Sequence, residues 1–423
     1  MNPLARRIQR IYLTLLLGNT LAASFIWGIN TLFLLDAGLS NLEAFAANAF
    51  FTFGMMVFEV PTGVVADTWG RRTSYLLGTI SLAGSTLLYW GLWQTQAPFW
   101  QWAIVSMLLG LGFTFFSGAV EAWLVDALTF AGYAGDLEAV FGRGQMVGGA
   151  AMLGGSVAGG VIAQATSLGV PFLLRVAVLL LMFVAAYRLM RDVGFTPQPR
   201  EQPLRAMQTV FVTSLDHGLK NPPVRWVMLA APFVSGVGFY TFYALQPYLL
   251  ELYGDSEAYA VAGLAAAIVA GSQILGGYAA PRIRALFKKR TTALILGTTA
   301  SAAILVLLGV TTAFWLALLL LVIWGLIFAA DMPIRQAYLN GMIPSQQRAT
   351  VLSFDSLMGS SGGVVIQPVL GKTADVYSYA TSYVVGAAFQ LIAVPFLAFS
   401  RRERAPSDTM VGSSEPAPAT ATG

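Results

Sequence analysis

The chain contains no cysteine, and its single histidine is His217. Without cysteine the protein can form neither a disulfide nor a cysteine-ligated iron–sulfur cluster, and thiol chemistry is excluded. His217 lies in a polar stretch between apolar segments, and the sequence shows no cluster of residues with metal-ligand spacing. We therefore expect no cofactor and no metal site. These absences also argue against an enzyme.

Charged residues are scarce as well. They make up 10% of the 423 residues, whereas hydrophobic residues make up 57% and the mean hydropathy is +0.69. A soluble domain carries about 25% charged residues. At roughly 20 residues for each membrane-crossing helix, this length accommodates about a dozen such helices joined by short loops. The composition therefore predicts an all-α protein whose partner is the lipid bilayer.

Twelve apolar spans can be read from the sequence. We predict an N-terminal six-helix half in residues 1–190, a cytoplasmic linker at 191–225, a C-terminal six-helix half at 226–404 and a disordered tail at 405–423. The linker is the long internal hydrophilic stretch and contains five prolines, and the tail is rich in Pro, Ala, Ser and Thr. The predicted spans are 11–35, 44–66, 73–93, 99–125, 144–167, 171–187, 226–250, 258–280, 291–310, 313–339, 351–369 and 379–400.

The basic residues indicate the orientation of the chain. If both termini are cytoplasmic, all of the 24 Lys and Arg residues except Arg175, Arg335 and Lys372 fall in cytoplasmic segments. This bias is what the positive-inside rule requires. It also accounts for the net charge of +4 without nucleic acid as a partner. We expect a multi-pass protein of the bacterial plasma membrane that functions as a monomer.

The two halves resemble each other in sequence. Glu121-Ala122-Trp123-Leu124 in the fourth span corresponds to Gln336-Ala337-Tyr338-Leu339 in the tenth. In each half a loop with one Arg follows, and then a glycine-rich span. Two repeated six-helix halves with a binding site between them are a transporter architecture.

A short polar motif separates the second and third spans. Gly63, Asp67 and Gly70 are followed directly by Arg71 and Arg72. A glycine permits close helix packing or a tight turn, and basic charges in so short a loop indicate the cytoplasmic side.

The spacing Gly-x-x-x-Asp-x-x-Gly-Arg-Arg resembles the loop between the second and third helices of the major facilitator superfamily. Thr68 stands where that family commonly has Arg or Lys. The glycine-rich stretch 154–160 is similar to a motif of the family's antiporters, with Ser156 in place of the usual proline. The resemblance implies a major facilitator fold and a relation to drug:proton antiporters.

The resemblance also implies a conformational latch, by which we mean Gly63, Asp67, Gly70, Arg71, Arg72 and Asp126. Asp126 would pair with Arg71 or Arg72. Asp67 would approach the start of the eleventh span in the other half. Closing these contacts would shut the cytoplasmic side in one state of the transport cycle.

Four ionisable residues within the spans are candidates for proton coupling or for a gate, because charges inside a membrane are costly. A carboxylate at Glu121 or Glu59 can carry a proton, or Glu59 can simply reach a nearby hydroxyl or backbone group. Asp331 and Arg335 stand at i,i+4 spacing and can pair on one helix face. Alternatively, Arg335 faces Glu121 across the cavity as a gate.

The spans that line the cavity in this family also carry aromatic and amide side chains, which suit an amphipathic or cationic substrate. The candidates are Trp27, Asn30, Trp123, Phe239, Tyr240, Tyr243, Gln246 and Trp324.

These features predict a secondary transporter for a small molecule. The G-x-x-x-x-G-K-[ST] pattern of nucleotide binding is missing, so gradients or the substrate itself must supply the energy. The first hypothesis is proton-coupled efflux of drugs or amphipathic metabolites by alternating access. The alternative is an uptake symporter or facilitator for a small organic solute or anion.

Overall fold

The computed structural model describes residues 3–196, 218–343 and 348–409. Most of the predicted linker and tail, together with His217, lie outside these ranges. The first residues of the predicted tail, 405–409, are described and contact the bundle. Asp408 accepts hydrogen bonds from the backbone N–H and the hydroxyl of Thr291, at 2.8 and 2.9 Å. A carboxylate stabilises a helix N-terminus, so this contact holds residues 405–409 against the bundle.

The first half of the chain forms helices packed around one apolar core. Their order is α1 (Pro3–Trp27), α2 (Asn30–Asp36), α3 (Asn41–Trp69), α4 (Arg71–Thr95), α5 (Phe99–Thr114), α6 (Ala119–Phe130), α7 (Leu137–Ala165) and α8 (Gly169–Leu189).

The second half forms helices around two further apolar clusters. They are α10 (Pro222–Tyr253), α11 (Tyr259–Ala285), α12 (Arg290–Val310), α13 (Phe314–Asn340), α14 (Arg348–Val376), α15 (Tyr379–Leu391) and α16 (Ala393–Arg402), followed by a short 3₁₀ turn at Pro406–Asp408.

Within the described residues, 11 helical segments are long and apolar enough to cross a membrane. α14 is not in this set, so twelve membrane crossings remain a prediction. Three predicted spans are interrupted. The first is broken between α1 and α2, the fourth between α5 and α6, and the last between α15 and α16. Gly118 has φ +66° at the break before α6, a conformation that glycine adopts without steric cost.

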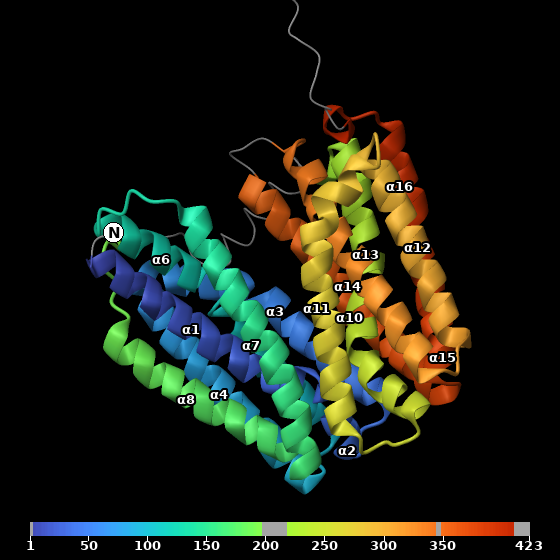
Figure 1. The fold of residues 1–423 in the computed structure, drawn as a ribbon, viewed down its shortest axis with the longest axis horizontal. Coiled ribbons are helices and arrows are strands. Elements are labelled where there is room, and N and C mark those ends of the chain that lie inside the picture. The colour runs from blue at the N-terminus through green and yellow to red at the C-terminus, as the bar shows by residue number, and fades with distance from the viewer. Residues whose placement is uncertain (1–2, 197–217, 344–347, 410–423) are drawn as a thin grey trace, which may run out of the picture.

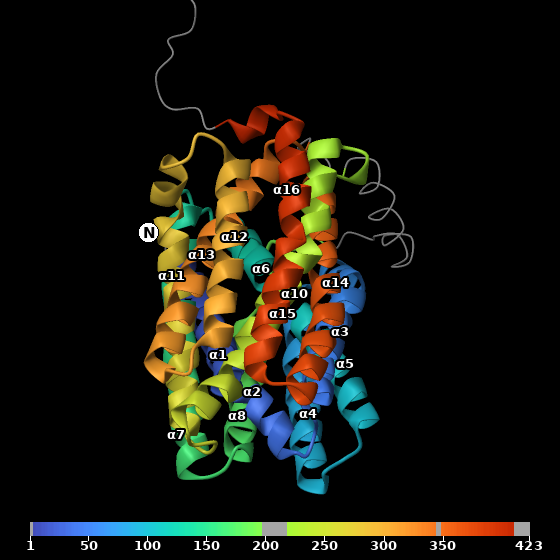
Figure 2. The ribbon, with the colours of Figure 1, turned by 90° about the vertical axis from the view of Figure 1, so that its right-hand side faces the viewer.

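The helices of the two halves pack in the same pattern. In the first half α1 packs on α7, α3 on α5, and α4 on α8. In the second half the corresponding pairs are α10 with α14, α11 with α13, and α12 with α15. Figure 1 shows the two bundles as separate groups of long helices, and in Figure 2 the second bundle lies in front of the first. This equivalence in packing agrees with the sequence repeat.

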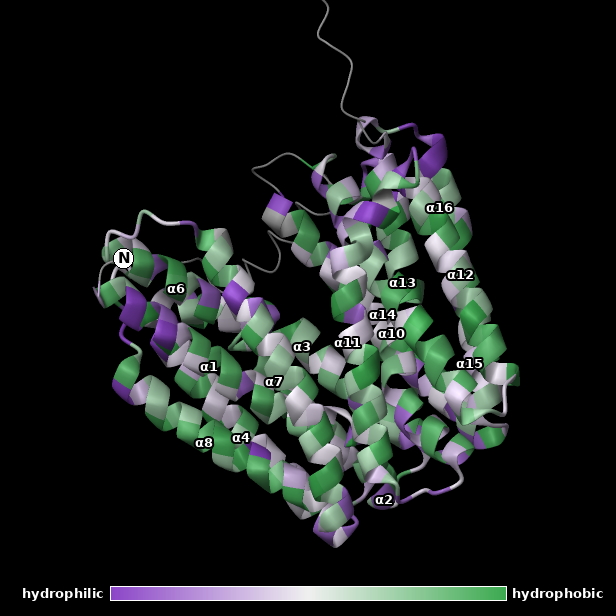
Figure 3. Cartoon of the chain, viewed as in Figure 1, coloured by the Kyte–Doolittle hydropathy of each residue, from purple (hydrophilic) through white to green (hydrophobic). Residues whose placement is uncertain are grey.

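The ends of the bundle differ in charge. We call the end that carries both described termini, residues 3 and 409, the basic end. The opposite end holds the loops with Asp36, Asp255 and Glu257, and we call it the acidic end. In Figure 3 hydrophobic residues cover the length of the helices, and hydrophilic residues gather toward the ends. This distribution is that of a protein whose middle lies in hydrocarbon.

The two halves meet mainly through two pairs of helices, α3 with α14 and α7 with α11, and α2 also packs on α10. In Figure 1 they are close together toward the acidic end and spread apart toward the basic end. At the α7–α11 contact Gly160 faces Gly263 backbone to backbone. A Cβ at Gly160 would lie 2.5 Å from the carbonyl oxygen of Tyr259. Small residues permit such close helix approach, as expected for the glycine-rich stretch 154–160.

We predict that Gly160→Ala lowers the melting temperature of the purified protein. The added methyl group overpacks a backbone contact, which typically costs about 1–3 kcal/mol. Gly154→Ala on the same helix is the matched control, because a Cβ there has no atom within 4 Å. Thermal unfolding of both variants in detergent measures the difference. Equal melting temperatures would show that the close α7–α11 contact is not rigid.

Candidate functional site

A central cavity of about 860 Å³ lies between the two halves. Both halves contribute to its walls: α1 to α5, α7 and α8 on one side and α10 to α16 on the other. A cavity of this size accommodates a drug-sized molecule. Most of the lining is apolar and aromatic, with a small number of amide, hydroxyl and charged side chains.

Five of the predicted cavity residues line this space: Trp27, Asn30, Phe239, Tyr243 and Trp324. Trp27 packs edge-on against Phe242, and Trp324 stacks on Phe328. Asn30 donates a hydrogen bond to the side-chain oxygen of Asn48 at 2.9 Å. The wall therefore combines aromatic faces with a few amide groups. Whether these residues contact substrate remains a prediction.

Three predicted cavity residues lie elsewhere. Trp123 is buried in the first half, where its indole N–H donates to the carbonyl of Arg191 at 2.8 Å. Tyr240 is buried in the second half and shares a hydrogen bond with Ser382 at 2.5 Å. Gln246 is fully buried at the contact between the halves. The break before α6 explains the misplacement of Trp123, because it changes which face α6 presents.

Gln246 bridges the halves at the break between α1 and α2. Its side-chain amide donates to the carbonyl of Trp27 at 2.7 Å and accepts from the backbone N–H of Thr31 at 2.9 Å. The hydroxyl of Thr31 also donates to the carbonyl of Tyr243 at 3.0 Å. The end of α1 leaves backbone groups without helical partners, and Gln246 satisfies two of them. These bonds close the acidic end of the cavity.

A second contact between the halves lies at the same end. The carboxylate of Asp375 accepts from the backbone N–H groups of Asn41 and Leu42, both at 2.8 Å. These are the first residues of α3, and a negative charge there is stabilised by the helix dipole. Asp375 on α14 therefore holds the N-terminus of α3.

Arg335 pairs with Asp355, and not with Asp331 or Glu121 as the sequence suggested. The guanidinium of Arg335 on α13 makes two bonds to Asp355 on α14, at 2.5 and 2.6 Å. Such a bidentate pair is geometrically specific and strong. The predicted i,i+4 pair is therefore wrong for this conformation, and the gate between Arg335 and Glu121 is not formed in it.

The three remaining candidate carboxylates differ in environment. Asp331 lines the cavity against Gly297 and has no hydrogen bond or ion pair within the described ranges. Glu59 accepts a hydrogen bond from the hydroxyl of Ser117 at 2.6 Å, which is the local contact considered as an alternative. Glu121 is in the first turn of α6 and does not line the cavity.

The motif at the turn between α3 and α4 contacts Asp192, a residue that the predicted latch does not include. Gly70 has φ +100° and is the N-cap residue of α4, and a Cβ there would overlap the carboxylate of Asp192. Asp192 accepts from the backbone N–H of Arg72 at 2.9 Å, and the Arg72 guanidinium donates to the carbonyl of Tyr187 at 2.5 Å. The motif is thus anchored to the end of α8 and to the segment that follows it.

The partners expected of the latch are arranged differently in this conformation. Arg71 pairs with Asp67 at 2.7 Å within the motif and lies over the ring of Phe195. Among the described residues, no ion pair joins Asp126 to Arg71 or Arg72. Gly63 is in an open position, because a Cβ there would meet no atom within 4 Å. The motif is in a suitable place for a latch, but its action between states remains a prediction.

Sequence reasoning did not select Arg175, which lies on α8 and lines the cavity. Only 3% of its surface is exposed, and its guanidinium lies over the ring of Phe113 at 5.9 Å from the centroid. The available signal was a single basic residue inside an otherwise apolar span.

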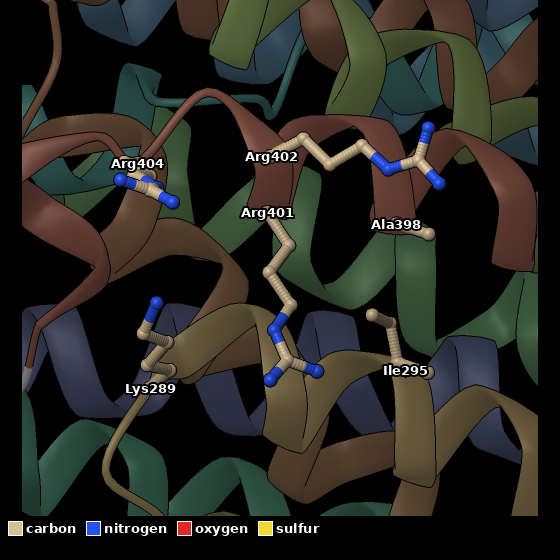
Figure 4. A pocket seen from close by; sticks show the side chains of 6 residues that line it. All are labelled: Lys289, Ile295, Ala398, Arg401, Arg402 and Arg404. Carbon is tan, nitrogen blue, oxygen red and sulfur yellow. The ribbon is translucent and has the colours of Figure 1, made fainter.

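A smaller pocket of about 420 Å³ lies apart from the cavity, at the basic end between α12 and α16. In Figure 4 Arg401 points from α16 toward α12, whereas Arg402 points away. Its cationic lining is the positive charge expected at this end of the bundle. It lacks the aromatic walls of the central cavity.

We predict that removing one member of the Arg335–Asp355 pair destabilises the protein more than removing both members. Arg335→Gln or Asp355→Asn alone leaves one charge buried, which costs about 3 kcal/mol or more. The double variant removes both charges and loses less than the sum of the single variants. Unfolding of the four proteins in a detergent–denaturant titration measures the coupling. Additive effects would mean that the two side chains do not act as a pair.

We predict a pH-dependent effect for Asp192→Asn. Burial raises the pKa of Asp192 above its ordinary 3.8, against the opposing effects of the Arg72 N–H and the nearby Arg72 and Arg71 charges. The carboxyl therefore contributes most stability in its neutral form, and that contribution is lost as the pH rises through the raised pKa. Asparagine can keep the accepted hydrogen bond without the charge.

Melting temperatures of the wild type and Asp192→Asn should converge below pH 3.8 and diverge above the raised pKa, with the variant the more stable. Thermal unfolding across this pH range provides the measurement. The opposite order at neutral pH would mean that attraction to the arginines outweighs burial.

Comparisons with known proteins agree with this architecture. A comparison with curated proteins found no match. Among solved structures, a point mutant of the nucleoside transporter NupG superposes with a TM-score of 0.78 at 13% identity, covering 93% of this chain and 99% of that one. A bacterial homologue of the human lysosomal transporter Spinster, described as inward-facing and unoccupied, gives 0.71 at 15% identity, covering 95% and 98%.

A POT family transporter in complex with a thioalcohol-conjugated peptide gives a TM-score of 0.67 at 14% identity, with 93% and 96% covered. At these identities the likeness concerns the fold. The family model described as Major Facilitator Superfamily matches residues 12–366 and 285–421, which together span nearly the whole chain. The protein is therefore a multi-pass membrane transporter that belongs to the major facilitator superfamily.

Proposed function

We propose that the protein is a proton-coupled secondary transporter that exports an amphipathic organic molecule by alternating access. The observation that carries the proposal is the central cavity, which both halves line and which hydrogen bonds between the halves close at the acidic end. A substrate bound there contacts both halves, so a relative rotation of the halves exposes it to one side or the other.

The orientation follows from the distribution of basic residues, which assigns the basic end to the cytoplasm. The conformation is then inward-facing. Export is the proposed direction because the glycine-rich stretch of α7, similar to that of the family's antiporters, forms the close contact with α11. Uptake of an organic solute or anion is the alternative direction, and the same cavity would serve it.

Asp331 is the proposed proton-carrying residue. It lines the cavity and has no partner among the described residues, whereas Glu59 and Asp355 are each bonded to another side chain. A carboxylate in a membrane interior is costly as an unpaired anion, so protonation and conformation are coupled. A group that gains and loses a proton as its exposure changes is what exchange against a proton gradient requires.

Inverted vesicles with an imposed pH gradient test this function. Addition of a transported amphipathic compound should release protons from wild-type vesicles, and Asp331→Asn should abolish that release while the protein still inserts and folds. Glu257→Gln, at an exposed loop of the acidic end, is the control and should behave as wild type. Proton movement unaffected by Asp331→Asn would refute the role of this residue. Accumulation of solute by right-side-out vesicles would establish uptake instead.

A further inference from the structure

The central cavity contains a positive charge without an anionic partner in the part of the chain that the structure describes. The guanidinium of Arg175 is buried, and its Nε has no hydrogen-bond partner among those residues. Within the ranges that the structure describes, no carboxylate pairs with it. The ionisable groups that influence it there are the hydroxyls of Tyr89 and Tyr243. The ring of Phe113 provides a cation–π contact.

The contacts that Arg175 makes within the protein do not explain why its charge is buried. Arg175 is six residues from the start of α8, but its side chain faces the cavity and is not exposed at the acidic end. A buried cation in a membrane protein is usually paired with an anion or with backbone carbonyls. The aromatic contact with Phe113 compensates only part of the lost hydration. An anionic group that arrives with the substrate would supply the missing partner.

Other donors are available beside Arg175. The hydroxyl of Tyr243, on α10 in the other half, lines the same cavity and makes no hydrogen bond within the described residues. The hydroxyl of Tyr89 is occupied by Ser106 at 2.5 Å. An anion held by Arg175 could therefore accept a second hydrogen bond from Tyr243. Such an anion would bridge the two halves close to the bonds that Thr31 and Gln246 make.

Resting on the proposed function, we propose that Arg175 and Tyr243 bind the carboxylate of a small organic monoanion with an aromatic or apolar body. A single guanidinium balances one charge, and its planar fork matches the two oxygens of a carboxylate. The aromatic walls around Trp27 and Phe113 accept the apolar body. This assignment narrows the substrate class and disfavours a cationic substrate at this end of the cavity.

Asp331 does not complete a zwitterion site with Arg175. It is 17 residues from the acidic end of α13, whereas Arg175 is six residues from that end of α8. At 1.5 Å of rise per residue, the two differ in depth by roughly 15 Å. A small amphoteric substrate cannot contact both charges at once. The anion site and the proposed proton site are therefore separate.

Binding at equilibrium tests the proposal on the full-length purified protein. The probes are phenylacetate, 3-phenylpropionate and indole-3-acetate, each compared with its neutral amide and with phenethylamine. The expected result is that carboxylates raise the melting temperature and that the amides and the amine do not. Equal effects of amides or amines, or no effect of any of the three carboxylates, would overturn the proposal.

Variants identify the residues. Arg175→Gln should abolish the response to carboxylates, and Arg175→Lys should keep the charge but bind more weakly because it lacks the planar fork. Tyr243→Phe should weaken binding about tenfold, as expected for the loss of one hydrogen bond to a charged group. Arg188→Gln, at the end of α8 outside the cavity, is the control. Undiminished carboxylate binding by Arg175→Gln would exclude this site.

No pH gradient is present in these binding measurements, so their outcome is distinguishable from that of the transport test. Loss of proton exchange in Asp331→Asn together with carboxylate binding that is independent of Arg175 would keep the transport mechanism and reject the anion site. Carboxylate binding that depends on Arg175, without proton exchange, would keep the anion site and reject the transport mechanism. If Arg175→Gln fails to fold, Tyr243→Phe and Arg175→Lys still discriminate between the outcomes.

Discussion

The contact between the two halves at the acidic end determines the form of the cavity. Gln246 satisfies backbone groups that the break after α1 leaves unpaired, and Asp375 satisfies the first N–H groups of α3. In a membrane, backbone groups without partners are costly, and here side chains of the second half complete the hydrogen bonding of the first. Glycines at the α7–α11 contact also bring backbones of the two halves close together. The cavity is closed at one end because these requirements are met there.

Some charged side chains in the cavity pair with each other, and others have no partner among the described residues. Arg335 and Asp355 neutralise each other and join α13 to α14, both in the second half. Arg175 and Asp331 have no such partners among the described residues, and they lie on different halves and at different depths. A transporter needs groups whose partners change during the cycle, because differential interactions are what shift a conformational equilibrium. Unpaired charges provide this property, and paired charges hold the helices that position them.

The sequence predicted the membrane class, the repeat and most of the spans, because these depend on composition, periodicity and charge bias. Of the eight side chains proposed for the cavity, five line it in this structure, whereas their role and that of the latch remain predictions. It could not predict which side of a helix faces the cavity where the helix is interrupted. Trp123 was misplaced for this reason, since Gly118 breaks the fourth span. Gln246 is one turn closer to the acidic end than Tyr243. At that depth Gln246 is buried in the contact between the halves, whereas Tyr243 lines the cavity. The choice of Asp355 as partner of Arg335 depends on packing between helices distant in sequence.

The long helix α3 connects the two ends of the molecule. Asp375 holds its N-terminus at the acidic end, and Asp67 and Arg71 lie at its other end, beside Asp192. With 29 residues the helix is roughly 40 Å long, and Pro61 removes one backbone hydrogen bond along it. α3 can therefore act as a lever, since a small tilt at the end held by Asp375 becomes a displacement of several ångströms, in order of magnitude, at the latch. We therefore expect release of these two hydrogen bonds on one face of the membrane to move the motif on the other.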